Sequence, residues 1–121
     1  RIMLGTFVLS AGYYDAYFTK AQQIRKLLVD EAAQLFKNYD AIISPTVPSP
    51  AFLIGDNTKD SVAMFLADIY TVYANLVGIP AISIPLYQHS SGLPFGLQIM
   101  CAPFEELSLL KLSTAIQKLH E

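Results

Sequence analysis

The side chain best placed to do chemistry in this sequence is Asp68, the only charged residue between positions 61 and 87. A carboxylate moved out of water without a partner is costly, or it is neutralised by a raised pKa. Asp68 lies inside a helix predicted over residues 61–76, too far from its start to cap it. Because perturbed carboxylates concentrate at functional sites, Asp68 is predicted to bind a ligand or shape a site. A buried ion pair with an arginine is the structural alternative.

The remaining reactive side chains match no motif for catalysis or metal binding. His89 and His120 have no second ligand at metal-site spacing. None of the serines lies in a Gly-x-Ser-x-Gly nucleophile elbow, and the sequence contains no phosphate loop or dinucleotide fingerprint. The only cysteine, Cys101, excludes an internal disulfide and a multi-cysteine zinc site. We therefore expect neither catalytic residues nor metal ligands among these 121 residues.

The composition indicates a single domain whose surface is normally covered by other protein. Of the 121 residues, 53% are hydrophobic and 15% are charged, whereas about 25% charged residues are typical of globular domains. Exposed apolar patches and unpaired sheet edges favour self-association, which we expect of this chain. The net charge of -2 and the absence of a long basic stripe disfavour direct binding to nucleic acid.

The apolar run at residues 61–87 is long enough to raise the question of a membrane span, which needs about 20 apolar residues. Asp68, Asn75, Gly78, Pro80 and Pro85 interrupt the run, and no positive flank follows it. A transmembrane helix is therefore disfavoured, and no membrane contact is expected.

Hydrophobic periodicity predicts an α/β chain with helices packed on part of a mixed β-sheet. Gly78 is predicted to end the third helix in a left-handed conformation, and Pro80 to block its continuation. The proline-rich loop at 45–50 is expected to leave the carboxyl end of a parallel strand, where open α/β sheets bind ligands. The predicted helices cover residues 1–10, 13–36, 61–76 and 105–119, and the predicted strands cover 41–44, 81–84 and 96–101.

Five ordered blocks of the sequence resemble the C-terminal part of the amidase signature family. They cover residues 1–7, 10–22, 40–46, 68–85 and 92–98. The Gly-Tyr-Tyr-Asp-Ala-Tyr segment that begins at Gly12 is similar to the A subunits of glutamyl-tRNA(Gln) amidotransferases in particular. Together the blocks extend over most of the chain, which makes the resemblance far more specific than any single block.

The resemblance implies a catalytic mechanism whose residues this sequence lacks. In the family a Ser, cis-Ser, Lys triad hydrolyses an amide through an acyl-enzyme, and no stretch here matches the glycine- and serine-rich signature that carries it. Residues 1–121 are therefore expected to be a single C-terminal fragment of an amidase domain, inactive alone. By resemblance, Arg1 holds the α-carboxylate of glutamine and Asp68 holds its α-ammonium.

The resemblance also implies a place in a larger complex in the cytoplasm. The complete enzyme would release ammonia from glutamine, and a partner subunit would use ATP and Mg²⁺ to convert Glu-tRNA(Gln) or Asp-tRNA(Asn). Other amidotransferase subunits, rather than this segment, would contact the charged tRNA, and no cofactor is expected in the segment itself. The alternatives are another amidase of the same family with a different substrate, and a non-catalytic interaction module.

Overall fold

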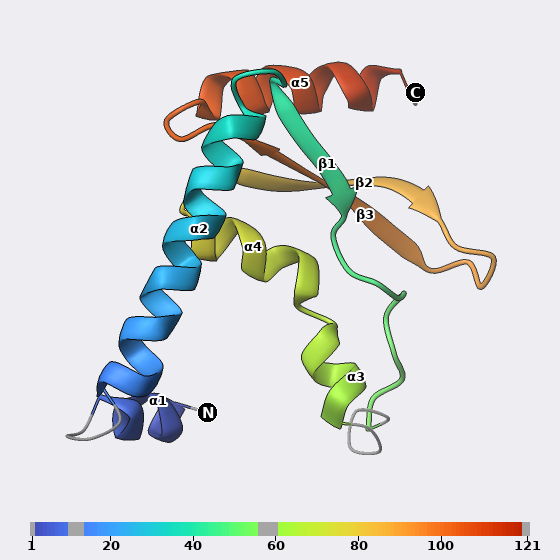
Figure 1. Ribbon diagram of the computed structural model, residues 1–121. Coiled ribbons are helices and arrows are strands. Elements are labelled where there is room, and N and C mark those ends of the chain that lie inside the picture. The colour runs from blue at the N-terminus through green and yellow to red at the C-terminus, as the bar shows by residue number, and fades with distance from the viewer. Residues whose placement is uncertain (1, 10–13, 56–60, 120–121) are drawn as a thin grey trace.

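The computed structural model describes residues 2–9, 14–55 and 61–119, which form a small sheet with helices on both faces (Figure 1). The chain is α/β, as the sequence predicts. In order, its elements are α1 (Ile2–Val8), the π-helical η1 (Tyr14–Thr19), α2 (Lys20–Leu35), β1 (Ala41–Pro45), α3 (Ser61–Leu66), α4 (Ile69–Val77), β2 (Ala81–Gln88), β3 (Pro94–Cys101) and α5 (Glu106–Lys118).

The sheet is antiparallel in the described residues, and the mixed sheet expected from the sequence is not observed. Its strand order is β1-β3-β2, and both strand pairs are antiparallel. The connection at 89–93 is too short for the crossover that a parallel pair needs, so β2 and β3 form a hairpin. The loop at 45–50 therefore leaves an antiparallel strand, and the reason for expecting a ligand there does not apply.

Each face of the sheet carries its own apolar core. Figure 1 shows α5 on one side of the sheet and α2 with α4 on the other. The first core contains Ala32, Ala74, Val77, Ile79 and Met100. The second contains Ile84, Ile99, Cys101 and Leu109. The strand β3 contributes to both cores because successive side chains of a strand point to opposite faces.

The predicted helix over 61–76 is divided into two helices, α3 and α4, by a break at Ala67 and Asp68. The sequence also predicts that this helix is buried, and that prediction is wrong for this chain. Only Ala74 and Val77 of α4 are buried, because α4 packs one face against α2. Gly78 has a φ of 78° and ends α4 in the predicted left-handed conformation.

The predicted helix over 13–36 begins with the π-helical η1 and continues as α2, which ends at Leu35. The guanidinium Nε of Arg25 donates a hydrogen bond of 2.7 Å to the carbonyl of Leu76, close to the end of α4. This bond satisfies a carbonyl in the last turn, where the helix offers no later amide as a partner. In the part of the chain that the structure describes, no helix is long and apolar enough to cross a bilayer.

Candidate functional site

Asp68 lies at the N-terminus of α4 and is exposed to solvent. Its main-chain carbonyl accepts bonds from the Val72 amide at 3.0 Å and from the Thr71 hydroxyl at 3.2 Å. Its carboxylate makes no capping bond. Both premises of the sequence argument are therefore corrected: the carboxylate is not buried, and it stands at a helix start. The break before α4, which periodicity does not reveal, accounts for the second difference, because it makes Asp68 the residue that precedes α4.

Within the described residues, where Arg25 is the arginine present, no ion pair between an arginine and Asp68 is observed. Over residues 2–9, 14–55 and 61–119, the salt bridge present is the exposed pair Lys26–Asp30, at 2.6 Å. Arg1, the other predicted substrate-binding residue, lies outside the described residues. The structure thus places one of the two predicted residues and leaves its carboxylate open to a ligand.

A row of polar side chains crosses the sheet next to the start of α4. Ser44 of β1 and Ser83 of β2 both pair in register with Gln98 of β3. The amide nitrogen of Gln98 donates to the Tyr70 carbonyl of α4 at 3.1 Å and to the Ser44 hydroxyl at 3.3 Å. We call Ser44, Thr46, Ser83 and Gln98 the polar row. Sequence reasoning missed this row, although the single polar residues within apolar strands were the signal available.

Gly96 allows two hydroxyls of the polar row to meet across β3. The Thr46 and Ser83 hydroxyls are 2.6 Å apart and share a hydrogen bond. A Cβ added at Gly96 would lie 2.8 Å from Thr46 Oγ1 and would also collide with Ser83 Oγ. An added Cβ would therefore displace at least one of the two hydroxyls, and with glycine here Thr46, which follows β1, contacts Ser83 of β2 across β3.

Replacing Gly96 with alanine is expected to destabilise the protein by about 1–3 kcal/mol, because overpacking forces neighbouring groups apart. The matched control is Gly5→Ala at an exposed position of α1, where an added Cβ meets nothing within 4 Å. That change should stabilise by about 0.5–1 kcal/mol, the usual gain for alanine over glycine in a helix. Urea unfolding followed by circular dichroism measures both. An unchanged or raised midpoint for Gly96→Ala would show that the hydroxyl contact is dispensable.

Cys101 lies in an apolar core, and His89 lies in the β2–β3 hairpin with its Nδ1 3.0 Å from the Ser91 hydroxyl. Cys101 is buried in the second core, and its pKa is raised by burial, and further by Glu105 and Asp40. A thiol kept protonated is a poor nucleophile. His89 accepts a hydrogen bond of 3.2 Å at Nδ1 from the Ser91 amide. The described ranges contain no group of three potential metal ligands, and His120 lies outside them.

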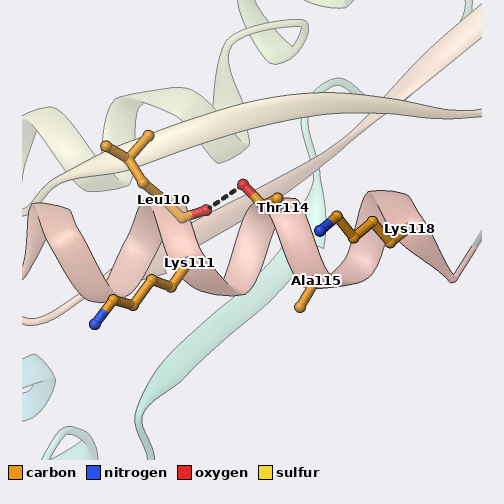
Figure 2. Close-up of a pocket in the computed structure, with 5 residues that line it drawn as sticks. All are labelled: Leu110, Lys111, Thr114, Ala115 and Lys118. Atoms are coloured by element: carbon orange, nitrogen blue, oxygen red, sulfur yellow. Dashed lines mark hydrogen bonds between the residues drawn. The ribbon is translucent and has the colours of Figure 1, made fainter.

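Two of the surface hollows formed by the described residues are well defined, and neither is lined by Asp68. The first, about 390 Å³, is lined by five residues of α5. In Figure 2 these side chains spread from the helix rather than converge, and the Thr114 hydroxyl is bonded to the Leu110 carbonyl at 2.8 Å. The second, about 200 Å³, lies between the proline-rich loop and the pair His89 and Phe95. Neither hollow presents converging charged groups. The candidate site is the exposed Asp68 carboxylate, and the polar row belongs to the sheet that packs beside the start of α4.

Known proteins resemble this chain both in sequence and in fold. The chain is 50% identical over 121 residues to the glutamyl-tRNA(Gln) amidotransferase A subunit of Acidobacterium capsulatum. The crystal structure of the corresponding protein from Thermotoga maritima superposes with a TM-score of 0.72 at 48% identity, over 87% of this chain and 23% of the other. Allophanate hydrolase of Kluyveromyces lactis shares the fold, with a TM-score of 0.73 at 24% identity, over 93% of this chain and 18% of the other.

The extent of these matches decides what they establish. The alignment with the Acidobacterium relative covers all of this chain but only 25% of that relative. The chain therefore spans about a quarter of the length of the curated proteins it matches. The sequence profile of the Amidase family matches residues 1–110, which is most of the chain. The chain therefore belongs to the amidase family.

Proposed function

We propose that this chain is part of the glutamine-hydrolysing subunit of an aminoacyl-tRNA amidotransferase. The observation that carries the proposal is the similarity along the whole chain to an amidotransferase protein of this kind. Because the chain spans only a fraction of those relatives, the activity proposed is that of the longer protein. Its substrate is glutamine, and its product ammonia would pass to a partner subunit that acts on Glu-tRNA(Gln) or Asp-tRNA(Asn).

Asp68 has the properties needed to hold the α-ammonium group of glutamine. It is exposed, and its carboxylate is an acceptor with no capping bond inside the protein. It stands at the N-terminal end of α4, where the aligned peptide dipoles favour negative charge. A carboxylate and an ammonium form a charge-assisted hydrogen bond, which is stronger than a bond between neutral groups.

Arg1 is proposed to hold the α-carboxylate of the same glutamine. A guanidinium offers a planar fork of donors that matches both oxygens of a carboxylate. Two opposite charges separated along the substrate backbone would select free α-amino acids over simple amides. The Ser, cis-Ser, Lys chemistry would be supplied by residues outside this sequence, and ATP with Mg²⁺ by the partner subunit. We place the complex in the cytoplasm.

The fold alone does not choose between glutamine and other amides, since the family hydrolyses more than one kind of substrate. A series of three amides tests the choice on the complete enzyme: glutamine, the analogue without the α-ammonium, and the analogue without the α-carboxylate. Losing a charge-assisted bond costs about 1.5–3 kcal/mol, so each analogue should lose roughly 10- to 150-fold in kcat/KM. Equal kcat/KM for all three would assign the chain to another amidase.

Exposed apolar side chains favour a second possibility, a non-catalytic interaction module. Large apolar residues such as Leu53, Ile54 and Leu110 are 76%, 107% and 54% exposed. Surfaces of this kind are usually covered by other protein. Self-association of the chain therefore stays a prediction, and sedimentation velocity at rising concentration checks it. A monomer at every concentration would contradict it.

A further inference from the structure

Gln98 is the buried polar side chain that links two elements of the fold. It is 3% exposed on the central strand β3. The other buried polar residue in the described part of the chain, Ser113, bonds the Leu109 carbonyl of its own helix. Gln98 instead reaches from the sheet to the Tyr70 carbonyl of α4, at 3.1 Å. Burying an amide is costly unless it is hydrogen-bonded, so this contact has a substantial role in the packing.

The Gln98–Tyr70 hydrogen bond lies in the first turn of α4, which has no buried residue of its own. The buried residues of α4, Ala74 and Val77, lie in its second half. In its first turn Ile69 is 54% exposed and Tyr70 is 36% exposed. The break after α3 removes the continuing helix that would otherwise hold this turn. A carbonyl has a second lone pair, so Tyr70 can accept from Gln98 in addition to its helical partner.

We propose that Gln98 is a positioning residue that ties the first turn of α4 to β3 and thereby sets the location of the Asp68 carboxylate. Asp68 immediately precedes α4, and its carbonyl accepts the Val72 amide at 3.0 Å within the same turn. A shift of this turn would carry the carboxylate with it. The inference deepens the proposed function and rests on it, because it assumes that Asp68 binds the substrate.

The test uses glutamine hydrolysis by the complete enzyme. Gln98→Leu keeps the size of the side chain and removes the donor. We expect KM for glutamine to rise by about 10-fold, the effect of one lost hydrogen bond, with kcat at saturation within about 2-fold. A role in folding alone would reduce the amount of active enzyme, which lowers kcat and leaves KM unchanged.

Two control variants separate the Tyr70 bond from general effects. Gln88→Leu makes the same change at the exposed end of β2 and should leave KM unchanged. Ser44→Ala removes the other oxygen acceptor of the Gln98 amide, 3.3 Å away, and keeps the bond to Tyr70. KM should stay within about 2-fold in this variant. A larger rise in KM for Ser44→Ala than for Gln98→Leu would overturn the role assigned to the Tyr70 contact.

A double-mutant cycle with Asp68→Asn shows whether Gln98 acts through Asp68. If it does, adding Gln98→Leu to Asp68→Asn should change KM by less than about 2-fold, and independent additive effects would overturn the inference. If Asp68→Asn raises KM and Gln98→Leu does not, the inference fails and the proposed function stands. If Asp68→Asn has no effect, the proposed function fails and the positioning role fails with it.

Gln98→Glu keeps the test decisive if the leucine variant does not fold. A protonated carboxyl can donate to the Tyr70 carbonyl and an ionised one cannot. Relative to the unsubstituted enzyme at each pH, KM of this variant should fall as pH is lowered and the carboxyl is protonated. If KM of the variant stays close to KM of the unsubstituted enzyme at every pH, the inference is overturned.

Discussion

Replacing Asp68 with asparagine in the complete enzyme is expected to raise KM for glutamine by about 100-fold, because the charge-assisted bond to the α-ammonium is lost. Asparagine has nearly the same shape, so the exposed start of α4 should keep its structure. The side chain makes no capping bond there, and the folded protein should unfold at nearly the same temperature. Steady-state kinetics over a wide range of glutamine concentrations measure the effect.

The substrate analogue without the α-ammonium makes this result specific. It has no group for Asp68 to bind, so Asp68→Asn should leave its kcat/KM within about 2-fold of the unsubstituted enzyme. The matched control Asp30→Asn removes an exposed carboxylate of α2 that is paired with Lys26 at 2.6 Å. KM for glutamine should not change in that variant. An unchanged KM for glutamine in Asp68→Asn would exclude Asp68 as the ammonium ligand.

Replacing Ile99 with alanine is expected to destabilise the protein by about 2–5 kcal/mol, the range measured for cavity-forming substitutions in cores. Ile99 is 0% exposed, lies on the central strand β3 and packs with Ile84, Cys101 and Leu109 beneath α5. Strands on both sides hold the backbone in register, so the cavity has little room to collapse. Urea unfolding at fixed protein concentration measures the loss.

Ile43→Ala is the matched control, because Ile43 faces Ile99 across the β1–β3 pair but is 53% exposed. The same chemical change there should cost less than about 1 kcal/mol, since little apolar area leaves the core. Equal effects at the two positions would mean that the second core is loosely packed.

Sequence periodicity located the strands well because β-branched and apolar residues are bounded by turn residues. Its main error was in β2, which was expected to close at Pro85 but continues to Gln88. Proline lacks an amide donor, and an edge strand tolerates it where that position faces away from its neighbour. The register shift between Pro85 and Tyr87 marks this irregularity. Only the pairing with β3, a tertiary contact, extends the strand.

Two other differences have the same origin. The last helix is predicted over residues 105–119, but α5 ends at Lys118 and Leu119 is 87% exposed. The break at Ala67 and Asp68 interrupts an apolar pattern that continues unchanged on both sides. Local sequence patterns indicate which residues prefer to be buried. Where a helix ends also depends on which of its residues pack against the rest of the chain.

By itself the sequence determined that the chain is α/β, where its strands lie, and that Asp68 is an isolated carboxylate in an apolar run. Its resemblance to amidases was confirmed by the family match over residues 1–110. Only the tertiary structure decided that Asp68 is exposed at the start of α4 and that Gln98 supports that turn from 28 residues away. Hydrogen bonds between residues so far apart leave no periodic trace, because the fold brings them together and local propensity does not.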